Sequence, residues 1–158
     1  MRTILPPNEI DIQNNEFSVF LAGSIELDLA ERWQDTVIND LTSCDNLVIL
    51  NPRRKDWDNS WTISIENENF KQQVYWELDG LEKADKIIMY FDPKTKSPIS
   101  LLELGLFSRS DKLMVICPDG FWRKGNVDIV CEKYNIQNVS SLKDAIKIIK
   151  SISAKGLK

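Results

Sequence analysis

The sequence predicts a doubly wound α/β fold, in which a mostly parallel five-stranded sheet carries helices on both faces. Two observations predict it. Short apolar segments of strand length alternate along the chain with longer segments whose apolar residues recur at helical spacing. The strand segments are apolar almost throughout, which is typical of parallel strands that are covered on both sides. A chain of 158 residues is long enough for one well-buried core, so we expect a single domain over residues 1–158.

The expected strands lie at Phe17–Ala22, Leu47–Leu50, Lys86–Phe91, Leu113–Cys117 and, at an edge of the sheet, Ile136–Val139. Turn residues close the apolar runs, as Gly23-Ser24 does after the first and Asn51-Pro52 does after the second. Asp92-Pro93 closes the third run in the same way. Strands that alternate with helices in this order are typical of Rossmann-like and flavodoxin-like domains.

The expected helices lie at Leu29–Leu41, Glu66–Ala84, Ile99–Ser108, Val127–Tyr134 and a last one that begins at Ser140 or Ser141. Each has a stripe of apolar residues, as Trp33, Val37 and Leu41 show in the first helix. Asp144 follows Ser141 by three residues, a spacing that resembles a capping box. We expect residues 1–15 to form an N-terminal extension and residues 154–158 a flexible tail.

The composition limits the chemistry that is available. The chain contains no histidine, which removes Ser-His-Asp and Cys-His nucleophile systems and His-ligated zinc, so catalysis must use carboxylates, Lys, Tyr, Ser or Cys. Its three cysteines, Cys44, Cys117 and Cys131, are far apart and lack CxxC spacing, so neither a disulfide framework nor a metal site is expected. We expect no cofactor.

The charge and the apolar runs bear on partners and location. The net charge of −4 argues against a nucleic-acid partner. The longest apolar runs have strand length, so no membrane partner is expected. The first 13 residues do not show a signal-peptide pattern, and the default expectation is a cytoplasmic protein.

Polar residues gather where the expected strands end, at Gly23–Glu26, Asn51–Trp61, Asp92–Glu103 and Pro118–Asn126. In sheets of this type, ligands bind beyond the carboxyl ends of the strands. The Gly23-Ser24-Ile25 turn suits an anionic or hydroxylated ligand, although such a turn is often only a turn. Arg53 and Trp57 suit a stacked base and a polar or anionic group, or else belong to a surface loop held by its aromatic residues.

Glu103 is the leading candidate for a catalytic carboxylate. Its neighbours along the chain are almost all apolar, and a buried charge needs a partner or a task. The alternative, a solvated Glu on an amphipathic helix, is equally open from the pattern alone. Gly105 costs helix stability and suggests close approach by a neighbour or a ligand. Asp79 lies beside the apolar face of its helix and is the candidate general acid, although most helix acids are solvated.

The ordered segments FLAGSI (20–25), DGLEKAD (79–85), a strand that ends in Asp92 and SPISLLELG (97–105) resemble the nucleoside 2-deoxyribosyltransferase superfamily. The resemblance is to its transferase-like branch and covers Phe17 to about Val139. The superfamily includes the 2'-deoxynucleoside 5'-monophosphate N-glycosidases. The chain departs from it in two places, since relatives often have a Tyr just after the first strand and a carboxylate-aromatic ending.

The resemblance implies roles for particular residues. Glu103 would be the nucleophile, and Asp79 would contact the base and help to protonate it. Ser97 would line the sugar or phosphate region, and Gly23-Ser24 resembles a phosphate-side contact. Asn126 falls near a residue that a neighbouring subunit donates, so we expect a homo-oligomer, a dimer or higher. Ile25, Arg53, Trp57 and Asp92 complete the expected substrate-binding set.

The expected reaction is cleavage of the N-glycosidic bond of a 2'-deoxynucleoside or its 5'-monophosphate through a covalent deoxyribosyl-Glu103 intermediate, with transfer to another nucleobase. The expected partners are therefore a small nucleoside or nucleotide and a nucleobase. The chemistry needs neither histidine nor metal. Hydrolysis by a monophosphate N-glycosidase, a non-catalytic nucleotide-binding module and a ribo-specific hydrolase remain alternatives.

Overall fold

The computed structural model describes residues 1–26 and 30–156, and in these it contains six strands and five helices. The strands are β1 (Arg2–Ile4), β2 (Phe17–Gly23), β3 (Leu47–Leu50), β4 (Lys86–Tyr90), β5 (Leu113–Ile116) and β6 (Gln137–Asn138). The helices are α1 (Trp33–Leu41), α2 (Glu68–Lys83), α3 (Pro98–Phe107), α4 (Lys124–Lys133) and α5 (Leu142–Ala154).

The six strands form one sheet in the order β1-β3-β2-β4-β5-β6, and every neighbouring pair is parallel. The predicted fold class is confirmed, with one strand more than the five expected. The additional strand, β1, lies within the stretch predicted as an extension. It has three residues, of which only Ile4 is buried, so no apolar run marks it in the sequence.

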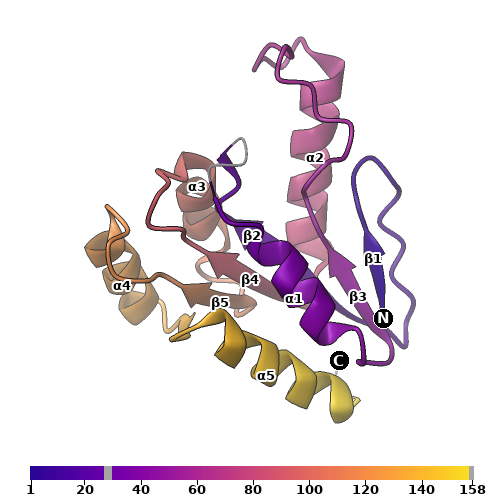
Figure 1. Cartoon of the computed structure of the whole chain (residues 1–158), viewed down its shortest axis with the longest axis vertical. Coiled ribbons are helices and arrows are strands. Elements are labelled where there is room, and N and C mark those ends of the chain that lie inside the picture. The colour runs from indigo at the N-terminus through magenta and orange to yellow at the C-terminus, as the bar shows by residue number, and fades with distance from the viewer. Residues whose placement is uncertain (27–29, 157–158) are drawn as a thin grey trace.

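Helices cover both faces of the sheet (Figure 1). One apolar core lies between the sheet and α2, α3 and α4, and it includes Trp76, Leu104 and Val127 from these helices. The other lies under α1 and α5, which contribute Val37 and Ile149. The strands between the two cores are buried on both sides, which explains why they read as continuous apolar runs.

The helix boundaries differ from the expected ones by a few residues. Among the described residues, α1 begins at Trp33, whereas the predicted start at Leu29 lies outside the described part. Helix α4 begins three residues earlier than expected, at Lys124. The predicted cap of α5 is present, since the Ser141 hydroxyl accepts a hydrogen bond from the Asp144 N–H at 3.2 Å. This helix continues to Ala154, and the last two residues of the predicted tail are not described.

The direction in which successive strands are added to the sheet reverses between β2 and β4, at the centre of the sheet. The connection from β2 leads to β3 on one side, whereas β4, the other neighbour of β2, leads to β5 on the opposite side. The carboxyl ends of β2 and β4 therefore flank the switch point, where doubly wound sheets bind their ligands. Gly23 is required there, because a Cβ at this position would lie 2.2 Å from the Tyr90 carbonyl oxygen.

Candidate active site

Three buried hydroxyl groups meet at the switch point. The Ser24 hydroxyl lies 2.5 Å from that of Ser97 and 2.9 Å from that of Thr95, and the Thr95 and Ser97 hydroxyls are 2.7 Å apart. Ser24 comes directly after β2, whereas Thr95 and Ser97 lie in the loop between β4 and α3. The Asp92 N–H donates to the Ser24 hydroxyl at 2.8 Å, which ties the two strand ends together. We call Ser24, Thr95 and Ser97 the hydroxyl cluster.

Helix α3 begins at the hydroxyl cluster. Ser97 adopts a left-handed backbone conformation with φ at +47°, and Pro98 follows as the first helical residue. The Ser97 N–H donates to the Glu26 carboxylate. A carboxylate is thus held at the positive end of a helix, which is the preferred place for a negative group.

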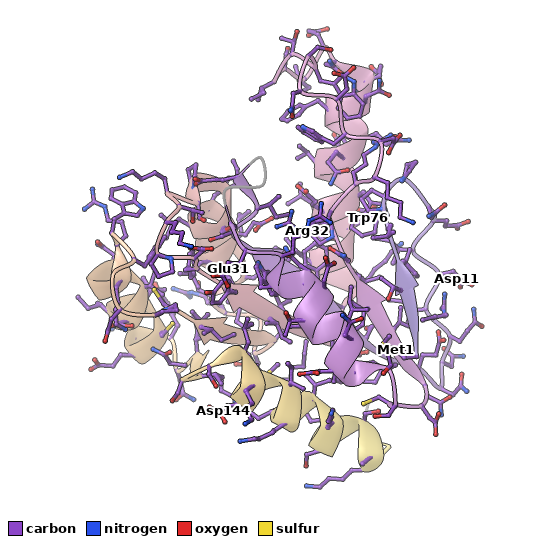
Figure 2. All side chains as sticks on the ribbon, viewed as in Figure 1. Met1, Asp11, Glu31, Arg32, Trp76 and Asp144 are labelled. Atoms are coloured by element: carbon purple, nitrogen blue, oxygen red, sulfur yellow. The ribbon has the colours of Figure 1, made fainter. Side chains whose placement is uncertain are left out.

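Asp92 holds the surrounding loops. It is buried, and its carboxylate accepts hydrogen bonds from the Lys94 N–H at 2.8 Å and from the Glu31 N–H at 3.0 Å. Glu31 lies at the start of α1, at the same edge of the sheet (Figure 2). Both Asp92 carboxylate oxygens are therefore engaged within the chain, which gives this predicted binding residue a clear part in organising the site.

Glu103 is buried on the inner side of α3, with 8% of its surface exposed. The solvated alternative that its pattern left open is therefore wrong. Burial, together with the neighbouring Glu77 carboxylate, raises the pKa of Glu103 to about 8. Burial likewise raises the pKa of Glu77 to about 7, against the opposing effect of a hydrogen bond from Gln73. Two carboxyls in one low-dielectric site resist joint ionisation, so the pair retains a proton near neutral pH.

Gln73 positions Glu77 on α2. Its side-chain amide donates to the Glu77 carboxylate at 2.9 Å and to the Pro52 carbonyl at 2.9 Å, which connects α2 with the end of β3. The Gln73 amide oxygen is enclosed and accepts no hydrogen bond from the described residues. A protonated carboxyl could donate to it, since such a group gains an O–H.

Asp79, the predicted general acid, lies elsewhere on α2. It is exposed, and it is not among the groups that raise the pKa of Glu103. Glu77 precedes it by two residues, which is about 200° around a helix, so the two side chains leave the helix on opposite sides. The carboxyl that influences Glu103 electrostatically is the one of Glu77. The sequence carried a signal for it, because Glu77 shares the stripe of Gln73 and Leu81, its neighbours at four residues on either side.

A close contact between α2 and the sheet helps to place Glu77. A Cβ added at Gly80 would lie 2.6 Å from the Phe20 ring, so only glycine permits this approach of the helix to β2. Gly80 lies one turn after Glu77 on the same side of α2. The glycine therefore sets how far the Glu77 carboxyl lies from the core.

The loop after β3 contributes basic and aromatic groups. Arg53 donates through Nε to the Gln34 side chain at 2.9 Å, which joins the loop to α1. Trp57 is 37% exposed and lies beside Trp61, with ring centroids 5.2 Å apart. The Arg54 guanidinium lies over the Trp61 ring at 4.9 Å. The predicted Trp57 is thus part of an aromatic pair that reaches the surface.

The remaining predicted residues lie at the margins. Ile25 follows the hydroxyl cluster residue Ser24 and is partly exposed, whereas Asn126 is exposed on α4. Within the described residues, no group of three or more Cys, Asp and Glu side chains could hold a metal ion. No described helix is both long enough and apolar enough to span a bilayer.

The fold and this geometry define a doubly wound α/β protein with a candidate ligand site at its switch point. A family model described as "Nucleoside 2-deoxyribosyltransferase like" matches residues 16–121, more than half of the chain. The chain therefore belongs to the nucleoside 2-deoxyribosyltransferase-like family, which confirms the predicted resemblance. A search of curated proteins finds no match. The matched range contains the hydroxyl cluster, Glu77 and Glu103.

Proposed function

We propose that the protein cleaves the N-glycosidic bond of a 2'-deoxynucleoside, or of its 5'-monophosphate, and transfers the deoxyribosyl group to a second nucleobase. The observation that carries the proposal is the pair of the buried Glu103 and the half-buried Glu77, whose pKa values are raised to about 8 and about 7. Such a pair can hold one carboxylate and one carboxylic acid together near neutral pH. Breaking a glycosidic bond needs both of these forms at the same time.

The proposed first step forms a covalent intermediate. A Glu103 carboxylate oxygen attacks C1' of the sugar, and the bond between C1' and the base nitrogen breaks with its electron pair going to the base. Glu77 gives its proton to the departing base, which leaves neutral. Glu103 is then esterified with deoxyribose and Glu77 is ionised.

The proposed second step reverses the first with another base. A nitrogen of the acceptor base attacks C1', its proton passes to Glu77, and the ester bond to Glu103 breaks to restore the carboxylate. If water attacks instead, the product is free deoxyribose or its phosphate. Transfer and hydrolysis thus share the first step and differ only in which molecule reaches C1'.

Glu103 must be ionised for the attack, although its pKa exceeds that of Glu77. Both carboxyls have raised pKa values, so the proton that the pair keeps can lie on either of them. Positive charge that develops at C1' in the transition state favours the Glu103 carboxylate further. A proton that either carboxyl can carry supports a nucleophile and an acid that alternate in charge.

Replacing the nucleophile tests the proposal. Glu103→Ala and Glu103→Gln should abolish both base exchange and base release, and intact-mass analysis of the wild type with substrate should show a deoxyribosyl adduct on Glu103. Turnover that survives in Glu103→Ala would refute the assignment. Tight nucleotide binding without any turnover in the wild type would indicate a binding module instead.

Hydrolysis is the second candidate, and the hydroxyl cluster favours it. Ser97 stands six residues before Glu103, where the resemblance places Ser in the monophosphate hydrolases and often Asp in the transferases. Incubation with deoxyadenosine or dAMP, with and without an acceptor base, separates the two reactions. Free base without acceptor means hydrolysis, and exchange only with acceptor means transfer. Ribonucleosides tested in parallel would reveal a ribo-specific hydrolase.

We also propose that the site is completed in a homo-oligomer, as the resemblance implies. Asn126 is exposed on α4, so its amide is accessible to another copy of the chain. Asn126→Ala should lower turnover without changing the stability of the isolated chain. Mixing this variant with Glu103→Ala should restore part of the activity if each site draws on two subunits.

A further inference from the structure

Gln73 is a buried side chain that joins helix α2 to the end of strand β3. It is 4% exposed, and its amide nitrogen donates to the Pro52 carbonyl and to Glu77 Oε1, each at 2.9 Å. Because a side-chain amide has two N–H bonds, these two contacts use both of them. Gln73 and Glu77 are four residues apart, so they lie on the same side of α2.

The two contacts fix the orientation of the Gln73 amide group. A rotation that exchanged its nitrogen and oxygen would place an oxygen against the Pro52 carbonyl, and two acceptors would then face each other. The segment around Pro52 is itself held, since the N–H of the next residue, Arg53, donates to the Asn51 side chain at 3.1 Å. Gln73 can therefore act toward Glu77 only as a donor.

A donor favours the ionised form of a carboxyl group. Burial raises the pKa of Glu77 to about 7, and the hydrogen bond from Gln73 opposes that rise. Burial and the neighbouring Glu77 raise the pKa of Glu103 to about 8, and among the described residues no hydrogen bond opposes them. Of the two carboxyls, Glu77 is thus the one whose ionised form has a donor.

The other groups around Glu77 do not stabilise its negative charge. From α3, the titratable group that interacts with it is Glu103, an acid. In the loop after β3, the Arg54 guanidinium donates to the Asp56 carboxylate at 2.9 Å. From β2, the Phe20 ring packs against this side of α2. No cation among the described residues lowers the pKa of Glu77, so its ionised form depends on the amide of Gln73.

The amide oxygen of Gln73 indicates that this side chain serves more than packing. The oxygen is enclosed, and it accepts no hydrogen bond from the described residues. An enclosed acceptor without a partner costs stability, and an apolar side chain of similar size would avoid that cost. The amide group is therefore explained by what its N–H bonds do, and one of them is directed at Glu77.

We propose that Gln73 is a positioning residue that binds the negative charge left on Glu77 when its proton passes to the departing base. The inference rests on the proposed reaction and gives a part in it to a residue that does not touch the reacting atoms. Oε1 of Glu77 accepts from Gln73, so the proton is carried on Oε2. In the first step this proton moves to a base nitrogen, the electron pair of its O–H bond stays on the carboxylate, and the Gln73 N–H remains on Oε1.

A neutral donor suits both steps of the proposed reaction. While the sugar is bound to Glu103, Glu77 is ionised and the Gln73 N–H stabilises its charge. When the acceptor base attacks, the same carboxylate must take a proton back. A cation in place of Gln73 would lower the pKa of Glu77 far enough to leave it ionised before any substrate binds. An amide N–H stabilises the charge less strongly, so Glu77 can both give and regain its proton.

A titration of the substrate-free protein tests the proposal without turnover. Gln73→Met keeps the length of the side chain and removes the donor. In protein labelled with 13C at its glutamate carboxyls, the pKa of Glu77 should rise by about one pH unit in this variant. The signal is assigned by its absence from Glu77→Gln. Gln73→Leu should move the pKa in the same direction, and a pKa that is unchanged in both variants would overturn the proposal.

Kinetics separate this role from a purely structural one. Gln73→Met should lower kcat for base release about 10-fold with little change in KM, and it should lower kcat no further in a Glu77→Gln background. The matched control is Gln72→Met, because Gln72 is the neighbouring residue of α2, is exposed and accepts from Arg54 at 3.1 Å. Its kcat should stay within about two-fold of the wild type.

Two outcomes distinguish the inference from the reaction on which it rests. An equal loss of kcat from Gln73→Met in the wild-type and Glu77→Gln backgrounds would overturn the role of Gln73, because the loss would not pass through Glu77. A wild type without turnover, together with a raised Glu77 pKa in Gln73→Met, would refute the proposed reaction and leave the action of Gln73 on Glu77 in place.

Discussion

At the level of single residues, the site is governed by what burial does to carboxyl groups. Glu103 and Glu77 share a low-dielectric environment, and both pKa values are raised to the neutral range. Asp92 is also buried, yet two backbone N–H groups bind its carboxylate. A buried carboxylate that accepts backbone hydrogen bonds can hold loops in place. A carboxyl group that is buried without enough hydrogen-bond donors has a raised pKa, so it keeps a proton that it can give to a ligand. This difference separates the pair proposed to react from Asp92, whose carboxylate oxygens both bind backbone N–H groups.

The carboxyl pair predicts a pH dependence of stability. The folded protein keeps protons on Glu103 and Glu77 that the unfolded chain releases above its ordinary pKa of 4.5. The free energy of unfolding should therefore be greatest below about pH 4.5 as far as this pair is concerned, and should fall as the pH rises to about 8. Urea denaturation of the wild type and of Glu103→Gln at several pH values measures it. The Glu103→Gln variant should lose most of this dependence, and equal slopes would contradict the assignment.

Replacing Glu77 and Asp79 of α2 one at a time tests which carboxyl group protonates the departing base. Glu77→Gln should lower kcat by about 10²–10⁴-fold, because the departing base loses its proton donor. Asp79→Asn, the matched control on the same helix, should change kcat by only a few-fold, since Asp79 is exposed away from Glu103. Steady-state kinetics with a deoxynucleoside and an acceptor base give both values. A larger loss for Asp79→Asn would return the role of acid to Asp79.

The Glu26 carboxylate predicts a preference at the 5' end of the sugar. It accepts the Ser97 N–H, next to the hydroxyl cluster that would line the 5' group, and a second negative charge there is unfavourable. The wild type should therefore use deoxyadenosine more efficiently than dAMP. Glu26→Gln should shift the ratio of the two kcat/KM values toward dAMP, by about 10-fold for each 1.4 kcal/mol of repulsion removed. An unchanged ratio would show that Glu26 does not face the 5' group.

At the level of elements, the position of α2 is set by one close contact. Helix α2 brings Glu77 to the site because Gly80 lets it approach Phe20 in β2. The position of α3 depends on other contacts, namely the hydroxyl cluster at its start and Leu104 in the core. Helix α2 carries Glu77 and helix α3 carries Glu103, so the distance between these two carboxyls depends on how both helices pack on the sheet.

Gly80→Ala tests this dependence. The new methyl group would lie 2.6 Å from the Phe20 ring, so α2 must move outward, with a loss of about 1–3 kcal/mol in the free energy of unfolding. Turnover should fall as well, because Glu77 moves with the helix. The control is Gly125→Ala in α4, where a Cβ meets nothing within 4 Å and stability should rise by up to about 1 kcal/mol. Thermal denaturation of both variants decides between these effects.

At the level of the whole molecule, the N-terminal segment closes one edge of the sheet. Strand β1 pairs with β3, and Ile4 and Ile10 join the core beneath α2. The Trp76 indole, on α2, donates to the Asn8 carbonyl at 2.8 Å, and Figure 2 shows Trp76 at this end of the molecule. Residues that looked like an extension therefore protect an edge strand, which otherwise invites association with other chains.

Removing residues 1–10 tests that role. The truncated chain loses two buried isoleucines and leaves the β3 edge unpaired, so the free energy of unfolding should fall by several kcal/mol, about 2 or more for each side chain. Static light scattering should show aggregation that the full chain does not show. The milder Trp76→Phe, which removes the hydrogen bond to Asn8 and part of the buried ring, should cost about 1–3 kcal/mol. A truncated chain of unchanged stability would contradict a structural role for β1.

Local patterns were sufficient for the central elements. The strands from Phe17 to Ile116 and the helices between them were predictable because buried parallel strands are apolar throughout and helices carry periodic stripes. Strand β1 was not predictable, because its three residues contain one buried side chain and its pairing is with a distant strand. The start of α4 was predicted late because Lys124 and Gly125 are not typical of a helix start.

For the site, the sequence by itself determined the kinds of groups. The absence of histidine, the Gly23-Ser24 turn and Glu103 in an apolar helix restricted the chemistry to carboxylates and hydroxyls at the strand ends. Only the tertiary structure decided which groups meet, because contacts across the sheet join residues more than 70 positions apart, as in Ser24 and Ser97. It brought Glu77 close enough to Glu103 to raise its pKa and left Asp79 exposed, since the side of α2 that faces inward depends on packing. The sequence specifies which side chains are present. The proximity of Glu103 and Glu77 and their raised pKa values arise only when the chain folds.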